Sequence, residues 1–297
     1  MLASKRVLAV ALALMFSLGT AYGYVGKAWA EYSVSFASPS ITITAPSRNN
    51  AECSGKLLIE GTSTLTQVWI CLRGPEKELE TYSVPVKEGR FSRTVDLRFG
   101  PGIYTVWAGD NPRRFDGSIR FTVNSLEDED LRYISPSAYV DSDSAVIKSL
   151  AESLVDSGAS DMDKVRSIHA WVTQNIAYDC AADSNTDSSM VPASQTVTLR
   201  KGICLNYALV TAALARAVGL PAKVVYGQAG AENDGFLPQL HAWNEILVDG
   251  KWVPVDATWD AGYIKDGRFI RKPSTTYFNP DESLWRKTHH PLEVTLD

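Results

Sequence analysis

The chain has 297 residues, of which 45% are hydrophobic and 21% charged, and its formal net charge is −5. This length is enough for two domains of ordinary size. The composition is that of globular proteins and excludes disordered, collagen-like and coiled-coil chains. An acidic chain without a long cluster of Lys and Arg is repelled by phosphate backbones, which argues against binding to nucleic acid.

The first 30 residues have the pattern of an export signal. Lys5 and Arg6 precede an apolar run over 7–18, which is shorter than the roughly 20 residues of a membrane-spanning helix. The Ala-Trp-Ala sequence at 28–30 predicts cleavage after residue 30, with 19–21 as an earlier alternative. We therefore expect a secreted or cell-surface protein with no stable membrane span after cleavage. The alternative is an uncleaved N-terminal anchor.

Residues 32–125 are predicted to form an all-β domain. Apolar and polar residues alternate in short runs separated by turn signals, as in strands that bury one face. The candidate runs are 40–44, 56–60, 67–71, 82–86, 90–97, 103–108 and 118–123. Their number and spacing predict an antiparallel sandwich of immunoglobulin-like shape. We expect Cys53 and Cys71, which lie in neighbouring predicted strands of an exported protein, to form a disulfide.

Residues 126–142 are acidic and predict a linker to a second domain at 143–297. Apolar residues at helical spacing predict two helices there, over about 143–156 and 160–175. His169 lies on the second helix and is expected to be a surface or packing residue. The histidines and cysteines have no metal-ligand spacing, so we expect neither a metal site nor a cofactor.

A further helix is predicted to begin at Cys204 and to end before Gly219 and Pro221. The start of a helix presents unpaired backbone N–H groups and a positive dipole end, which favour a nucleophilic thiolate. Gly202 allows a tight backbone entry and the close approach of a substrate. Alone, a cysteine in this position is more often a small buried residue.

His241 and Asp256 are predicted to be neighbours on a β-hairpin. The Asp-Gly dipeptide at 249–250 predicts a two-residue turn. With that turn, Trp243 pairs with Asp256, and His241 is the diagonal neighbour of Asp256 on the same face of the sheet. A carboxylate there can orient the imidazole, and the imidazole can then accept the proton of Cys204.

Three segments resemble the nucleophile, histidine and aspartate motifs of the transglutaminase-like superfamily. They are 201–227 (with Lys-Gly-Ile-Cys-Leu-Asn-Tyr-Ala at its start), 241–245 (His-Ala-Trp-Asn-Glu) and 252–260 (Trp-Val-Pro-Val-Asp-Ala-Thr-Trp-Asp). The likeness covers roughly 145–290 and implies an α+β, papain-like core. It makes Cys204 the nucleophile, His241 the general base and acid, and Asp256 the orienting carboxylate.

The resemblance further implies a thioester between Cys204 and a peptide or carboxamide carbonyl, which water or an amine then resolves. The backbone N–H of Cys204 is the natural first oxyanion donor, and Gln195 is our candidate for the second. Tyr178 matches a recurrent aromatic of the family, and we expect it to bind substrate together with Trp243 and Gly202. The expected substrate is a protein or peptide, with cell-wall peptides included.

Two alternatives stay open. The first is a catalytically inactive cell-surface module that uses the β domain for binding or assembly. The second concerns Cys180, which is expected to be a free buried thiol but could instead pair with Cys204 and switch an enzyme off under oxidising conditions.

Overall fold

The computed structural model of the chain describes residues 33–182, 190–230 and 238–295. The predicted export signal and its cleavage site lie outside these ranges and stay predictions. Within the described residues, no helix combines the length and the hydropathy that crossing a bilayer requires.

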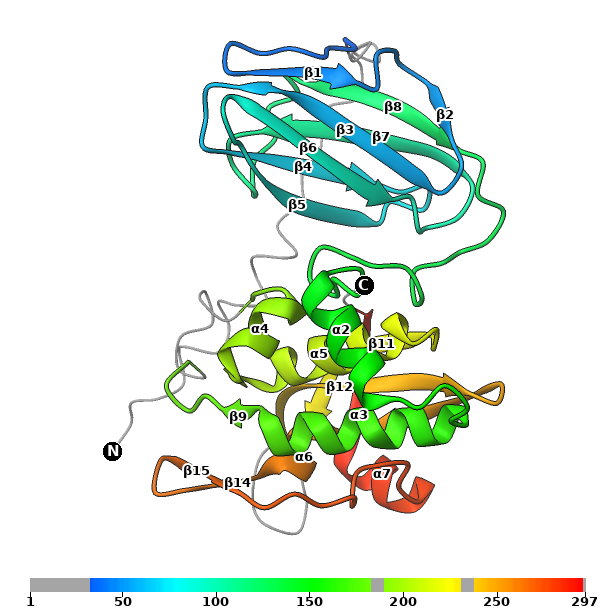
Figure 1. Cartoon of the computed structure of the whole chain (residues 1–297), viewed down its shortest axis with the longest axis vertical. Coiled ribbons are helices and arrows are strands. Elements are labelled where there is room, and N and C mark those ends of the chain that lie inside the picture. Colours follow the sequence, from blue (N-terminus) through cyan, green and yellow to red (C-terminus); the bar gives the residue numbers. More distant parts are fainter. Residues whose placement is uncertain (1–32, 183–189, 231–237, 296–297) are drawn as a thin grey trace, which may run out of the picture. The chain divides into compact units, whose positions relative to one another are not determined.

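The first eight strands form a β-sandwich (Figure 1). One sheet has the order β1-β3-β6, and the other has the order β2-β8-β7-β4-β5. Their bounds are β1 Ile41–Ala45, β2 Ala51–Cys53, β3 Lys56–Ser63, β4 Gln67–Arg73, β5 Leu79–Pro85, β6 Arg90–Asp96, β7 Gly102–Gly109 and β8 Arg120–Ser125. Residues alternate between buried and exposed along β3 and β5, and the buried residues of both sheets share one core. The all-β prediction is confirmed, whereas the immunoglobulin-like shape stays a prediction.

The predicted Cys53–Cys71 disulfide is wrong, because both thiols are free. Cys53 lies on β2 and Cys71 on β4, and strands β8 and β7 run between them in the same sheet. Three strand spacings amount to roughly 14 Å, twice the largest Cα separation of about 7 Å that a disulfide can span. Strands that are close in the sequence of a sandwich need not be adjacent in its sheets.

A buried ion pair joins the sandwich to the segment that follows it. Arg98 Nε donates to Glu80 Oε2 at 2.9 Å, and both side chains are almost fully buried. Arg98 also donates to the carbonyl of Arg132 at 2.8 Å, and Glu80 accepts from the backbone N–H of Ala138 at 2.6 Å. Both charges are therefore compensated inside the protein, as buried charges must be.

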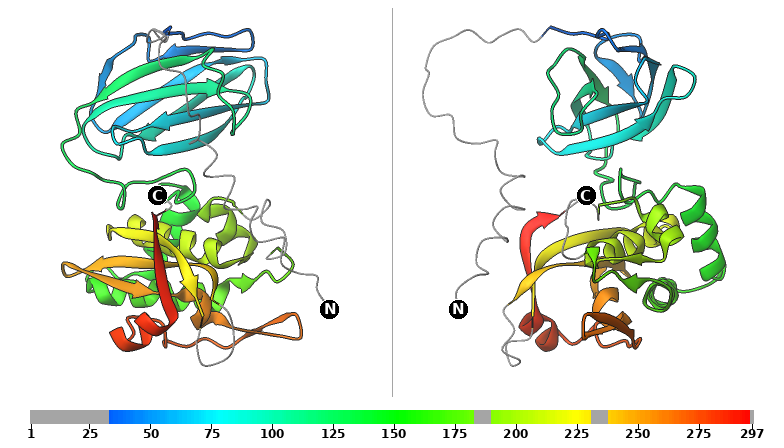
Figure 2. Two further views of the ribbon diagram at one scale, coloured as in Figure 1. Left: turned by 180° about the vertical axis from the view of Figure 1, so that it is seen from behind. Right: turned by 90° about the vertical axis from the view of Figure 1, so that its left-hand side faces the viewer.

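The second half of the chain is an α+β unit built on a four-stranded sheet of order β13-β12-β11-β16. Its helices are α2 Ala145–Leu154, α3 Asp161–Asn175, α4 Ala193–Leu199, α5 Cys204–Ala217, α6 Ala257–Ala261 and α7 Glu282–Thr288. Its strands are β9 Ala177–Tyr178, β10 Lys201–Gly202, β11 Ala222–Ala229, β12 Gln239–Val248, β13 Lys251–Val255, β14 Gly262–Lys265, β15 Arg268–Arg271 and β16 His289–Thr295. Helices α2 to α5 lie on one side of the sheet (Figure 2).

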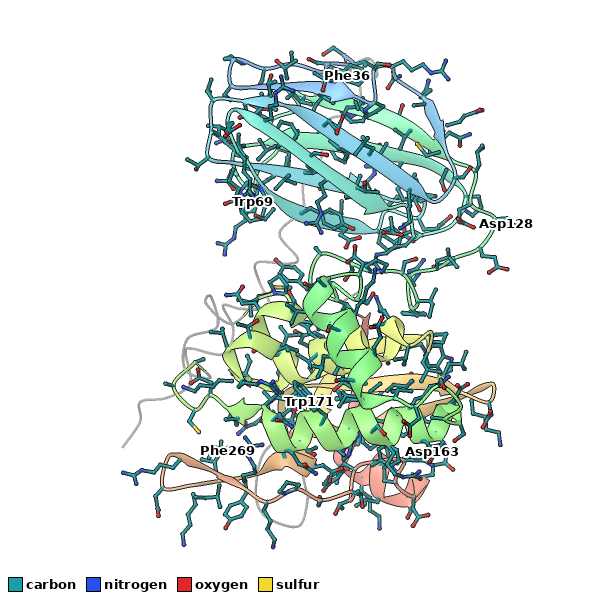
Figure 3. The ribbon with its side chains drawn as sticks, in the orientation of Figure 1. Phe36, Trp69, Asp128, Asp163, Trp171 and Phe269 are labelled. Carbon is teal, nitrogen blue, oxygen red and sulfur yellow. The ribbon has the colours of Figure 1, made fainter. Side chains whose placement is uncertain are left out.

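Helix α5 is the centre of this unit. Every residue from Leu205 to Arg216 is buried, as expected for a helix that is apolar on all sides. Trp171 of α3 and Phe269 of β15, both labelled in Figure 3, pack against the same core. The first residue of α5, Cys204, is half-exposed, so a rigid and buried helix holds a thiol that a reagent can reach.

The β12–β13 hairpin has the predicted register, with Val248 opposite Lys251 and Asn244 opposite Val255. Its turn residues, Asp249 and Gly250, have φ values of 50° and 76°, which Asp-Gly dipeptides adopt readily in two-residue turns. A second Asp-Gly turn with similar φ values, 51° and 71°, joins β14 to β15 at 266–267.

Candidate active site

The local structure before Cys204 depends on Gly202. The side-chain oxygen of Asn206 accepts from the backbone N–H of Ile203 at 2.9 Å and thereby satisfies one donor at the start of α5. A Cβ on Gly202 would lie 2.5 Å from Cβ of Asn206, so only glycine leaves room for this cap. Gly202 is itself buried. Our expectation that it contacts substrate stays a prediction, and in the structure it leaves room for the Asn206 cap on the helix that carries Cys204.

His241 joins the thiol to a carboxylate. Nε2 of His241 donates to Oδ2 of Asp256 at 2.7 Å, and the side chain of Cys204 lies near enough to the same imidazole to raise its pKa. Because Nε2 is used by Asp256, Nδ1 is the ring nitrogen that faces the thiol. The diagonal placement predicted from the hairpin thus brings His241 and Asp256 into direct contact, next to Cys204.

The two carboxylate oxygens of Asp256 have different partners: one caps a helix and the other binds His241. Oδ1 accepts from the backbone N–H groups of Thr258 at 2.9 Å and Trp259 at 3.1 Å, and so caps the N-terminus of α6. Oδ2 accepts from His241. The cap fixes the carboxylate, and the fixed carboxylate in turn fixes the plane of the imidazole.

Burial and charge act in opposite directions on the pKa values of this pair. Burial alone would lower the pKa of His241, but the charge and hydrogen bond of Asp256, with a smaller contribution from Cys204, raise the pKa to about 10. Burial would raise the pKa of Asp256, but the charge and hydrogen bond of His241, supported by His289, hold it well below its usual range. The pair is therefore imidazolium and carboxylate at neutral pH.

His289 is a site residue that the sequence did not reveal. Its Nε2 lies 3.2 Å from Oδ2 of Asp256, on the oxygen that also binds His241. The side-chain ligand atoms of the three residues lie within 4.8 Å of one another, close enough to hold a metal ion. Their mutual hydrogen bonds account for the cluster without one. No local pattern links position 289 to position 256, because β16 reaches the site through its pairing with β11.

Trp243, an expected substrate contact, is buried with only 1% of its surface exposed, and its contact with substrate stays a prediction. Its ring packs edge-on against Trp285 and His289, with centroid distances of 5.8 and 5.0 Å. Its Nε1 is buried without a hydrogen-bond partner in the described part of the chain. The half-exposed Trp259, whose ring centroid is 5.4 Å from that of His241, is the tryptophan that borders the site.

Four other residues singled out in the sequence lie outside the group formed by Cys204, His241 and Asp256. Tyr178 is half-buried, pairs with Gly202 in a parallel bridge and packs against a tyrosine of α5, so its contact with substrate stays a prediction. Gln195 is exposed on α4, and its role as an oxyanion donor also stays a prediction. Cys180 is free and half-buried. His169 is a packing residue, since it is buried and bonded to Asp260 at 2.9 Å.

A half-exposed thiol at a helix N-terminus, beside a hairpin-borne His–Asp pair, defines a papain-like α+β core of the transglutaminase-like kind. Residues 148–257 match the model of the transglutaminase-like superfamily. The chain therefore carries a transglutaminase-like domain in its second half, preceded by an all-β domain.

Two curated relatives match the same half of the chain. The Kyphoscoliosis peptidase of Homo sapiens is 27% identical over 151 residues, which are 48% of this chain and 22% of that protein. The protein of the same name from Mus musculus is 27% identical over 154 residues, or 49% of this chain and 23% of that protein. The chain thus spans less than a quarter of the length of these relatives.

Solved structures show more distant likenesses. A candidate cysteine protease from Cytophaga hutchinsonii is 20% identical, with 76% of this chain and 69% of that chain covered and a TM-score of 0.39. The transglutaminase of red sea bream is 11% identical, with 75% of this chain and 50% of that chain covered and a TM-score of 0.31.

Proposed function

We propose that this protein is a thiol-dependent acyl-transfer enzyme acting on a peptide or carboxamide. The thiolate of Cys204 attacks the carbonyl carbon, and the C–N bond breaks to leave a thioester. The imidazolium of His241, which already holds the proton given up by the thiol, delivers it to the departing nitrogen, which leaves as an amine or as ammonia. The observation that carries the proposal is the placement of the Cys204 side chain beside the imidazole of His241, which is itself hydrogen-bonded to Asp256.

Two features of the site support this chemistry. The buried carboxylate of Asp256 stabilises the charged imidazole that forms when the thiol gives up its proton. The backbone N–H of Cys204 lies in the first turn of α5, where N–H groups have no partner within the helix and can bind the oxyanion of the tetrahedral intermediate. The carboxylate and the N–H group are both in position before a substrate binds, because the surrounding structure already fixes them.

We propose water as the acceptor that resolves the thioester, which makes the protein a peptidase or amidase. The name of the two curated relatives supports hydrolysis. The expected substrate is a protein or peptide, with cell-wall peptides included. Because the first 30 residues fit an export signal, we place the reaction outside the cytoplasm.

The test begins with intact-mass labelling of the folded chain by iodoacetamide, which needs no substrate. We expect Cys204 to alkylate fastest of the four cysteines and His241→Ala to slow it, with Cys180→Ser as the matched control that leaves the rate unchanged. Peptide mixtures are then digested in water enriched in ¹⁸O, with and without a fluorescent primary amine. Product carrying ¹⁸O supports hydrolysis, and product carrying the amine shows a transferase. If Cys204 reacts only after unfolding, the protein is an inactive module.

A further inference from the structure

We propose that His289 is a positioning residue of this site, which holds Asp256 by donating a second hydrogen bond to Oδ2, the oxygen that also binds the catalytic imidazole. This inference rests on the proposed function. It extends the site from three residues to a chain of five: Thr288, His289, Asp256, His241 and Cys204.

The contacts of His289 fix which of its nitrogens carries the proton. An ionised carboxylate can only accept, so Nε2, at 3.2 Å from Oδ2 of Asp256, must donate. Nδ1 lies 2.9 Å from the hydroxyl of Thr288. In a neutral ring Nδ1 then has no proton, so the Thr288 hydroxyl, which also lies 3.0 Å from the carbonyl oxygen of Leu284, turns its one proton towards Nδ1. Burial lowers the pKa of His289 and opposes the effect of Asp256, which keeps the ring neutral at physiological pH.

Aromatic rings hold His289 in this orientation. Trp285 stacks on it with a centroid distance of 3.7 Å and an interplanar angle of 8°. Trp243 meets it edge-on at 5.0 Å, and Trp259 and Tyr277 lie at 4.7 and 5.6 Å. The side chain of His289 is fully buried. Its ring therefore cannot turn away from Asp256, and water does not replace it.

The glycine at position 227 makes this arrangement possible. Gly227 lies on β11 between His241 of β12 and Pro291 of β16. A Cβ at this position would collide with the indole of Trp243 and with the carbonyl oxygen of His290. The missing side chain lets Trp243 and β16 approach closely, and this approach places His289 over the carboxylate.

The electrostatic consequence has a definite sign. The titratable groups that act on His289 are Asp256, His241 and His290, and the hydroxyl-bearing ring of Tyr277 also faces it. The bond from His289 draws charge density away from the oxygen that binds His241. Without it, Asp256 is a stronger base, so the pKa of Asp256 and the pKa of His241 both rise.

The test compares His289→Phe, which keeps a flat ring against Trp285 but loses the donor, with His289→Gln, which can still donate to Asp256. Two-dimensional NMR of ¹⁵N-labelled histidine measures the pKa of His241 in the full chain, independently of any turnover. We expect the Phe variant to raise this pKa above the wild-type value and the Gln variant to restore it. The exposed His290→Phe should leave it unchanged.

Activity supplies the second readout. For the Phe variant we expect kcat to fall roughly 10- to 100-fold, as after loss of a hydrogen bond to a charged group, with KM nearly constant and the alkaline limb of kcat/KM, which follows the His241 imidazolium, moved to higher pH. An unchanged His241 pKa in His289→Phe overturns the proposal even if stability falls. If that variant does not fold, Thr288→Val, which removes the hydroxyl partner of Nδ1 together with that hydroxyl's contacts to two carbonyls of α7, must shift the same titration, or the proposal fails. A shifted pKa without any peptide cleavage keeps the positioning role and refutes the enzyme instead.

Discussion

The ion pair of His241 and Asp256 makes the stability of the protein depend on pH in a predictable way. The pKa of His241 is raised from its ordinary 6.5 to about 10, so folding strengthens proton binding. The resulting stabilisation is complete below pH 6.5 and disappears as the pH rises towards 10. Asp256 has a lowered pKa, so its contribution is lost only on acidification and does not change in this window. At about 1.4 kcal/mol for each pKa unit, the effect is at most about 5 kcal/mol.

Urea unfolding at several pH values between 6.5 and 10 measures this pH-dependent stabilisation by the ion pair. The wild type is compared with His241→Gln. The amide of glutamine can still donate to Asp256 but does not titrate. We expect the free energy of unfolding of the wild type to fall relative to the variant by a few kcal/mol across the window. The exposed His290→Gln serves as the control and should follow the wild type. Parallel curves for wild type and His241→Gln would refute the assigned ion pair.

Three further sets of substitutions test other contacts of the structure. Gly202→Ala should destabilise the protein by about 1–3 kcal/mol, because its methyl group collides with Asn206; thermal unfolding measures the loss, and iodoacetamide labelling should show slower alkylation of Cys204. Asp256→Ser should keep the cap of α6 and be about 1 kcal/mol more stable than Asp256→Ala. The rate of peptide cleavage should fall at least 100-fold in both variants. Equal stability of the two variants would contradict the assigned cap. Arg98→Met should cost about 3–5 kcal/mol in urea unfolding because it leaves the charge of Glu80 buried alone, and Glu80→Leu in the same chain should recover most of it.

The sequence predicted the parts of the site that short-range rules control. The Asp-Gly dipeptide determines the register of β12 and β13, and register determines that His241 meets Asp256. The bounds of α5 also follow from local signals. Gly202 and Cys204 mark its start, and Gly219 and Pro221 end its apolar run. These elements needed no knowledge of the rest of the fold.

The features that the sequence did not predict depend on the order of strands and layers. The predicted Cys53–Cys71 disulfide was wrong because strands β8 and β7 lie between the strands that carry the two cysteines. Trp243 is buried by elements that are distant in sequence, among them Trp285 and His289, so its burial could not be read locally. His289 reaches Asp256 across 33 positions, on a strand whose partner no turn signal identifies.

The chain contains two Asp-Gly turns of similar backbone geometry, and they differ in how much change of length they tolerate. The length of the turn at 249–250 determines the register of the two strands that carry the site. One inserted residue would turn His241 and Asp256 to opposite faces, and two would separate them by a further strand repeat of nearly 7 Å. The turn at 266–267 lies between exposed residues, and its length does not determine the position of any residue of the site. A protein engineer who needs an insertion point for an epitope or a fluorophore should therefore use the second turn and leave the first at its native length.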